Sequence, residues 1–174
     1  MILKVCRLGH PVLRRQAERL TPQALASPRN QTLIDSMIET MIEYHGVGLA
    51  APQIHESLAI AVMESQGPRG DIPLTVLVNP SIAVADEERI EEDWEGCLSI
   101  PELRGRVPRF ARVEVRALDR HGKAIEFTAE GFFARVVQHE LDHLMGRVYI
   151  DRMRGFGTLA HLEEWRRFWI PQNQ

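Results

Sequence analysis

The stretch Gln138-His139-Glu140-Leu141-Asp142-His143-Leu144 decides how the rest of this 174-residue sequence is interpreted. It lies in a run from about Gly131 to Gly146 whose apolar residues recur at steps of three and four, which is typical of an amphipathic helix. Residues four positions apart on a helix lie one turn apart on the same face, so His139 and His143 can share one metal ion. Glu140 lies one position further on, where it can reach a water on the metal instead of the metal itself.

A catalytic metal site of this type needs a third protein ligand, and the sequence offers two sources for it. The first is Cys97, in Glu95-Gly96-Cys97-Leu98-Ser99, where no second cysteine lies near enough to suggest a closed four-thiolate site. The second is Glu163 or Glu164, about 20 residues beyond His143, because some two-histidine metallopeptidases take a downstream carboxylate. Spacing alone leaves both sources open.

A third unusual stretch is Gly46-Val47-Gly48-Leu49-Ala50-Ala51-Pro52-Gln53. It lacks the third glycine of a dinucleotide-binding motif and the Lys-Ser/Thr pair of a phosphate loop, so nucleotide binding has little support. In structural terms it is a helix stop followed by a turn. In functional terms its glycines permit a close backbone approach, and the Gln53 amide can donate to a developing oxyanion.

The remaining pattern predicts a mixture of helices and antiparallel strands. Further helices are predicted over residues 28–45 and 158–169, and strands over 58–63, 75–78, 112–118 and 124–127. The turn Asp119-Arg120-His121-Gly122 joins the last two strands into a hairpin. We therefore expect a single α+β domain over residues 1–174, with antiparallel strands packed around a central helix that carries the His-Glu-x-x-His motif.

The composition excludes several other classes of protein. Hydrophobic residues make up 44% and charged residues 26% of the chain, which is ordinary for a globular domain. A formal net charge of -3 gives no basic surface for nucleic acid, and no apolar run is long enough to cross a membrane. Because the first residues lack the pattern of a secretory signal, a cytoplasmic location is expected.

The three stretches together resemble the three signature motifs of the peptide deformylases, Gly-x-Gly-Leu-Ala-Ala-x-Gln, Glu-Gly-Cys-Leu-Ser and Gln-His-Glu-x-Asp-His-Leu, in that order. The similarity extends from about Val5 to Arg152. It implies an enzyme that removes the N-formyl group from newly made polypeptides beginning with formyl-methionine. The sequence departs from the family pattern at His55, where many members have glycine, at Pro52, and in a tail that lacks the strongly basic helix of some bacterial members.

The resemblance also implies roles for individual residues. Cys97, His139 and His143 would bind one divalent metal ion, and Glu140 would act as the acid and base. Gln53 and the backbone N–H of Leu98 would complete the oxyanion site. The residues expected to contact substrate are Val47, Gly48, Arg104, Phe132, Arg135 and Val136, the last three because they share the helix face of His139.

The metal and the partners follow from the same resemblance. The ligand set by itself favours zinc, whereas the family implies Fe(II) as the native ion, with zinc, nickel or cobalt in purified protein. The expected partners are nascent N-formyl-methionyl polypeptides and, transiently, the ribosome. Two alternatives use the same helix: a metallopeptidase that cleaves internal bonds, and a domain in which the metal only stabilises the fold.

Overall fold

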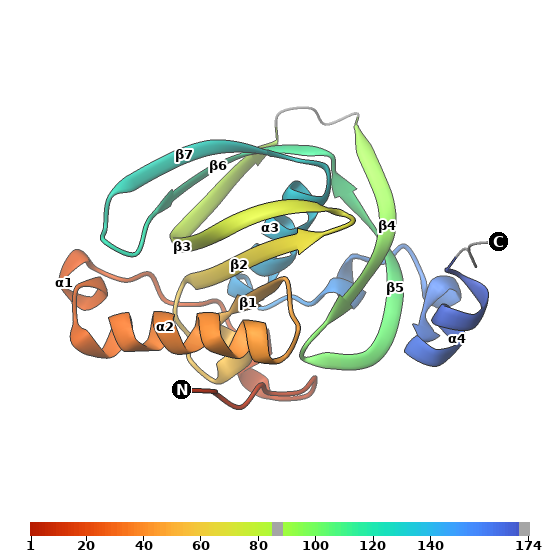
Figure 1. The fold of residues 1–174 in the computed structure, drawn as a ribbon, viewed down its shortest axis with the longest axis horizontal. Coiled ribbons are helices and arrows are strands. Elements are labelled where there is room, and N and C mark those ends of the chain that lie inside the picture. The colour runs from red at the N-terminus through yellow and green to blue at the C-terminus, as the bar shows by residue number, and fades with distance from the viewer. Residues whose placement is uncertain (85–88, 171–174) are drawn as a thin grey trace.

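The computed structural model describes residues 1–84 and 89–170 and confirms the α+β class (Figure 1). Its larger sheet has five antiparallel strands in the order β1-β2-β3-β6-β7. These strands are β1 (Gly48–Ala50), β2 (Ile60–Gly67), β3 (Gly70–Val84), β6 (Arg112–Leu118) and β7 (Ala124–Glu130). The smaller sheet contains β4 (Ile90–Cys97), β5 (Ile100–Phe110) and β8 (Ala160–His161).

Two long helices accompany these sheets, with several shorter ones. The helices are α1 (Pro22–Leu25), α2 (Pro28–Glu43), α3 (Gly131–Leu144) and α4 (Leu162–Phe168). The short 3-10 turns are η1 (Pro11–Arg14), η2 (Ala51–Ile54), η3 (Tyr149–Arg152) and η4 (Phe156–Thr158). Among the described residues, no helix combines the length and apolar character needed to cross a bilayer.

The larger sheet is buried on both faces at β2. Ile60 and Val62 pack into the cluster on the α2 side, whereas Ala61 and Met63 pack into the cluster on the α3 side. Successive side chains of a strand point to opposite faces, so this run of small and branched apolar residues serves two cores at once. The sheet therefore separates α2 from α3, as Figure 1 shows.

The boundaries of both long helices follow from local chemistry. Ser27 caps α2 by accepting from the N–H of Asn30, with Pro28 at the first helical position, so the helix predicted over 28–45 is confirmed. The central helix is also confirmed, and it ends before Gly146, which has a φ of 71°. A Cβ on Gly146 would meet the backbone of Arg14 at 2.7 Å, so this turn requires glycine.

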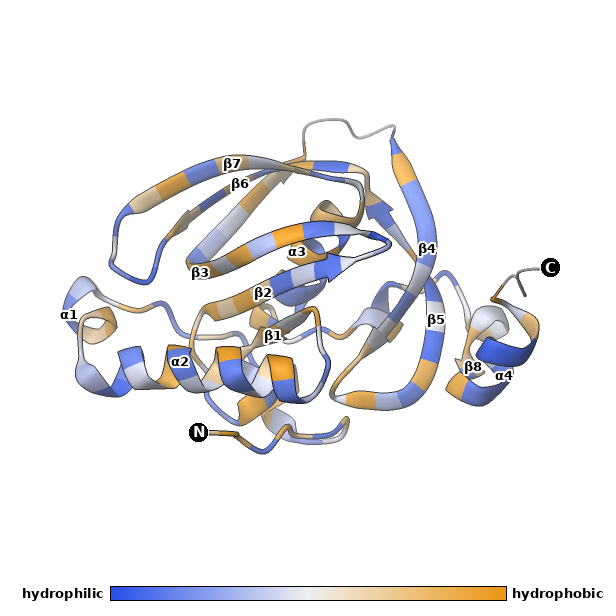
Figure 2. Ribbon diagram, viewed as in Figure 1, coloured by the Kyte–Doolittle hydropathy of each residue, from blue (hydrophilic) through white to orange (hydrophobic). Residues whose placement is uncertain are grey.

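The hairpin predicted around Asp119 is confirmed, because β6 and β7 pair in register from Arg112↔Glu130 to Leu118↔Ala124. The long β4–β5 hairpin was not predicted. Its first strand carries four acidic residues, which strands usually avoid, and Figure 2 accordingly colours most of β4 as hydrophilic. Ion pairs with arginines of β5 compensate for this composition: Arg109 pairs with Glu95 at 2.9 Å and Arg106 with Glu92 at 4.0 Å.

The helix predicted over residues 158–169 is wrong in its first part. Residues Leu162–Phe168 are helical, but Ala160 and His161 form β8 and pair with Arg104 and Leu103 of β5. The backbone of this segment hydrogen-bonds to the edge of the small sheet, so the helix starts only after the strand ends. This pairing fixes α4 beside the β4–β5 hairpin.

Candidate metal centre

Two elements meet to form a cluster of metal-binding side chains. Helix α3 presents His139 and His143, and the end of β4 presents Cys97. The ligand atoms of these three residues all lie within 4.8 Å of one another, and Cys97 Sγ is 3.3 Å from His143 Nε2. Glu163 and Glu164 lie exposed on α4 and are not part of the cluster. The geometry therefore favours Cys97 as the third ligand.

Glu95 orients the first histidine of the cluster. Its carboxylate Oε2 lies 2.9 Å from His139 Nδ1, so the proton of the neutral ring belongs on Nδ1 and the lone pair on Nε2. Arg109 donates two hydrogen bonds to the same carboxylate, of 2.9 and 3.0 Å. This pairing of Glu95 with Arg109 holds His139 in its ligating orientation.

A wider ion-pair network surrounds this contact. Arg109 also donates to Asp142 of α3 at 2.6 Å, and Arg152 donates to the same carboxylate. Arg135 donates to Glu95 at 2.8 Å and to backbone carbonyls of β4 and β5. Arg109, Glu95, Arg135 and Asp142 are all buried, so the network joins α3 to the β4–β5 hairpin through interior charges.

The electrostatics of the cluster suit a cation. Burial opposes ionisation of Glu95, but hydrogen bonds and charges from His139 and Arg109 outweigh it and lower the pKa of Glu95 well below its usual range. Burial lowers the pKa of His143, which therefore stays neutral with a free lone pair. Around His139, burial is outweighed by hydrogen bonds and charges from Cys97 and Glu95, which raise its pKa; the same negative surroundings stabilise a metal cation once it displaces the proton from Nε2.

The donor set fits a divalent transition metal. Two imidazoles and one thiolate are typical ligands of borderline-soft ions, and three protein ligands leave a position open for a substrate or water. His143 turns Nε2 toward the Cys97 sulfur, at 3.3 Å, so Nε2 is the nitrogen placed to ligate the metal. The Glu95 carboxylate supplies the outer support that ligating histidines normally have.

Glu140 lies beside the cluster without belonging to it. It is 3% exposed, and its Oε2 has no hydrogen-bond partner among the described residues. Burial raises the pKa of Glu140 to about 7, close to the value that suits a general base near neutral pH. Gly48 packs closely against the Glu140 carboxylate: a Cβ on Gly48 would lie 2.2 Å from Glu140 Oε1.

This contact gives the first prediction. Gly48→Ala forces the Glu140 carboxylate to move, and we expect kcat to fall by roughly 10²-fold, as for a reacting group misplaced by about 1 Å. Bound metal should be unchanged, because no ligand is touched. Gly67→Ala is the matched control: it also lies in a strand, but its Cβ would meet nothing closer than 3.6 Å, and activity should remain. Equal activity of the two variants would contradict the contact.

Gln53 points its amide nitrogen at the cluster. Its Oε1 accepts from the N–H of Ala50 at 2.8 Å, which fixes the orientation of the amide. Its Nε2 then lies 3.4 Å from Cys97 Sγ and 3.3 Å from Ser99 Oγ. Leu98 lies in the tight turn between β4 and β5, directly after Cys97. Both predicted oxyanion donors therefore border the same space.

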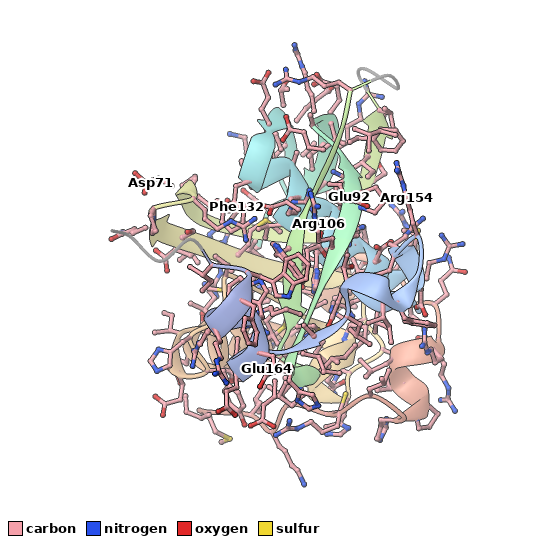
Figure 3. All side chains as sticks on the ribbon, turned by 90° about the vertical axis from the view of Figure 1, so that its right-hand side faces the viewer. Asp71, Glu92, Arg106, Phe132, Arg154 and Glu164 are labelled. Carbon is pink, nitrogen blue, oxygen red and sulfur yellow. The ribbon has the colours of Figure 1, made fainter. Side chains whose placement is uncertain are left out.

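A pocket of about 500 Å³ opens over the cluster. It is lined by all the predicted site residues except His143, which is fully buried. The predicted residues that line it are Val47, Gly48, Gln53, Cys97, Leu98, Arg104, Phe132, Arg135, Val136, His139 and Glu140. Arg135 lines the pocket, but its guanidinium donates hydrogen bonds to Glu95 and to backbone carbonyls of β4 and β5. Figure 3 looks onto this side of the molecule, with Phe132 labelled.

Sequence reasoning missed an aromatic wall of this pocket. Trp94 of β4 and Trp165 of α4 both line it, with their ring centroids 6.1 Å apart. The Arg104 guanidinium lies 5.7 Å from the Trp165 ring. The helix predicted over residues 158–169 contains Trp165, but the sequence did not predict that this residue lies at the pocket. The β8 pairing that carries α4 to the pocket left no pattern in the sequence.

Comparisons with known proteins agree with this site. The family model described as polypeptide deformylase matches residues 2–158. Peptide deformylase 2 of Pseudomonas putida is 42% identical over 168 residues, covering 94% of each chain. Peptide deformylase 1 of Nitrosomonas europaea is 43% identical, covering 90% of this chain and 92% of its own.

Solved structures give the same result. A class I type b peptide deformylase from Acinetobacter baumannii, bound to Met-Ala-Ser, has a TM-score of 0.83 at 36% identity and covers 88% of this chain and 99% of its own. The peptide deformylase of Thermotoga maritima has a TM-score of 0.80 at 37% identity, covering 89% and 99%. The metal-binding cluster, the sequence relatives and the fold lead to one conclusion: this chain belongs to the peptide deformylase family.

Proposed function

We propose that the Cys97, His139 and His143 centre carries out the family's reaction, with residues 1–174 acting as a single catalytic domain. Peptide deformylases are metal-dependent enzymes that remove the N-formyl group from nascent polypeptides. The observation that carries the residue assignment is the convergence of the three ligand atoms within 4.8 Å beneath a pocket that Glu140 and Gln53 also line.

Each group has a distinct task in this proposal. The metal, when bound, supplies Lewis acidity that lowers the pKa of water and polarises the formyl carbonyl. Glu140 accepts a proton from the attacking water and delivers it to the departing amine, which leaves formate and a free N-terminus. Gln53 Nε2 and the Leu98 N–H donate to the oxygen of the formyl group as negative charge develops on it.

The substrate would bind as an extra strand. β1 is the edge strand of the larger sheet, with β2 on one side, and its residue Gly48 and the preceding Val47 line the pocket. An extended peptide can therefore hydrogen-bond to this edge, as in other cases of strand addition. The methionine side chain would lie against Phe132 and Val136 on α3, and Arg104 would contact the residues that follow. The Met-Ala-Ser complex of the Acinetobacter baumannii enzyme supports this class of ligand.

We propose Fe(II) as the native metal, with zinc, nickel or cobalt replacing it in purified protein. A site with one thiolate and two imidazoles accepts each of these ions, and its sulfur makes the iron form sensitive to oxygen. Nascent formyl-methionyl chains place the reaction in the cytoplasm. A transient association with the ribosome would deliver these chains, and co-sedimentation with ribosomes would test it.

The deciding experiment measures formate release from a formyl-Met-Ala-Ser peptide by protein loaded with iron under anaerobic conditions. We expect turnover that a chelator abolishes and that added metal restores. The acetyl-Met-Ala-Ser peptide and an unformylated peptide serve as controls and should react far more slowly. Comparable cleavage of internal peptide bonds would instead support the metallopeptidase alternative, which the comparisons do not favour.

The aromatic wall gives the second prediction. Trp165→Ala removes the α4 side of the pocket, and we expect kcat/KM for formyl-Met tripeptides to fall roughly fivefold, mainly through KM, since one aromatic contact contributes about 1 kcal/mol. Trp169→Ala is the control, because Trp169 also packs on Trp94, at 5.3 Å, but does not line the pocket. Identical kinetics for the two variants would exclude Trp165 from substrate binding.

A further inference from the structure

We propose that Cys6, His10 and His55 form a second metal site, separate from the catalytic centre, that binds Zn²⁺. One potential ligand atom from each of these residues lies within 4.8 Å of the other two. They are the second group of metal-binding side chains found among residues 1–84 and 89–170 with this spacing. This inference does not depend on the proposed catalytic roles.

The three residues come from two segments that are held together by the backbone. Cys6 donates its N–H to the carbonyl of Gln53 at 2.8 Å, which fixes the N-terminal segment against η2. His10 precedes η1, and His55 ends η2, so both rings project from the ends of short turns. The rings lie edge to face with centroids 4.7 Å apart. The cluster is therefore assembled by the fold rather than by neighbouring positions in the sequence.

The backbone of His55 makes glycine the suitable substitution for testing the site. His55 has a φ of 69° and a ψ of 7°, the left-handed conformation that glycine adopts most easily. Histidine adopts this conformation more readily than most other non-glycine residues, and His45 does so as well, with a φ of 53°. Here an imidazole occupies the position and points toward a buried sulfur.

The chemistry of the three donors selects the metal. One sulfur and two imidazole nitrogens match Zn²⁺ better than hard cations such as Mg²⁺ or Ca²⁺, which prefer oxygen. Cys6 is buried, whereas His10 and His55 are exposed, so the metal would sit at the surface with its fourth position open to water. This is the ligand composition of the catalytic centre, assembled a second time on different elements.

Binding has three identifiable costs, the first of which is the hydrogen bond that the Cys6 thiol donates to the Pro52 carbonyl at 3.5 Å. The Val12 N–H donates to His10 Nδ1 at 3.2 Å, and this weak capping hydrogen bond must be given up when the ring ligates a metal. Burial raises the pKa of the Cys6 thiol, so Zn²⁺ must displace its proton. These costs make the second site weaker than the catalytic centre, which has the outer support of Glu95.

The experiment titrates chelator-treated protein without an affinity tag with Zn²⁺ and counts the bound metal by mass spectrometry after removal of free ions. We expect two equivalents per chain in the wild type. His55→Gly should retain only one, since glycine keeps the backbone conformation and removes only the imidazole. His45→Gly is the matched control: His45 also has a positive φ, of 53°, but is not in the cluster, so this variant should still bind two equivalents.

Cys6→Ser provides an independent second variant and should also bind one equivalent. With iron loading, His55→Gly should keep wild-type formate release, because His55 does not line the catalytic pocket. Failure of deformylation in all forms would concern the proposed function and not this site. A wild type that saturates at one equivalent, or a second equivalent that persists in both His55→Gly and Cys6→Ser, would overturn the proposal.

Discussion

Glu140→Gln should lower kcat for formate release by roughly 10²- to 10⁴-fold while leaving the metal content unchanged, the range expected for loss of a general acid and base. The amide has the size of the carboxylate but cannot accept a proton from water or return one to the departing amine. The side chain is buried against Gly48, so the substitution should leave its position unchanged. The measurement is steady-state kinetics on iron-loaded protein together with metal analysis.

Kinetics and metal analysis of Glu140→Gln together distinguish a residue that transfers protons from a metal ligand or a structural residue. Loss of metal in Glu140→Gln would mean that the carboxylate ligates the ion, which its absence from the cluster argues against. Full activity would exclude it from proton transfer. A fall in kcat with KM and metal content unchanged is the result that agrees with the geometry, because the missing interaction is made only in the transition state.

The helical part of the site could be predicted from the sequence because its residues are close together in the chain and lie on one helix. His139, Glu140 and His143 lie within five consecutive positions, and the apolar period of α3 fixes which face they share. The same reasoning predicted α2 and the β6–β7 hairpin. In each case the pattern and the element cover the same few residues.

The third ligand could not be identified from local sequence patterns. Cys97 lies 42 positions before His139, and spacing alone could not separate it from the carboxylates of α4. The contact depends on the β4–β5 hairpin, whose acidic first strand does not resemble a strand in isolation. The family motifs suggested Cys97, and the fold then placed its sulfur 3.3 Å from His143.

The aromatic wall and the Cys6 cluster were also inaccessible to sequence patterns. Trp165 reaches the pocket only because β8 pairs with β5, an interaction of two residues on each strand. The Cys6 cluster requires the N-terminal segment to bind the carbonyl of Gln53. Both features depend on backbone hydrogen bonds between segments far apart in the chain, and the periodicity of side chains does not predict such bonds.

Glu95→Ala should lower the free energy of unfolding by roughly 3–5 kcal/mol, because it leaves the buried charges of Arg109 and Arg135 without their shared partner. For a chain of this length that corresponds to a fall in melting temperature of roughly 6–20 °C. Metal affinity should also fall by roughly 10- to 100-fold, since His139 Nδ1 loses the acceptor that orients the ring. Thermal unfolding of metal-free protein isolates the first effect, and metal titration measures the second.

Two matched variants decide whether burial is the cause. Glu126→Ala removes a carboxylate that pairs with Arg116 at 2.9 Å, but both side chains are largely exposed, so we expect a loss of only about 0–1 kcal/mol. Glu95→Gln keeps the packing and one acceptor for His139, so its metal affinity should lie between those of the wild type and Glu95→Ala. Equal destabilisation by Glu95→Ala and Glu126→Ala would mean that the arginines find water or other partners. In that case the network would orient His139 without stabilising the fold.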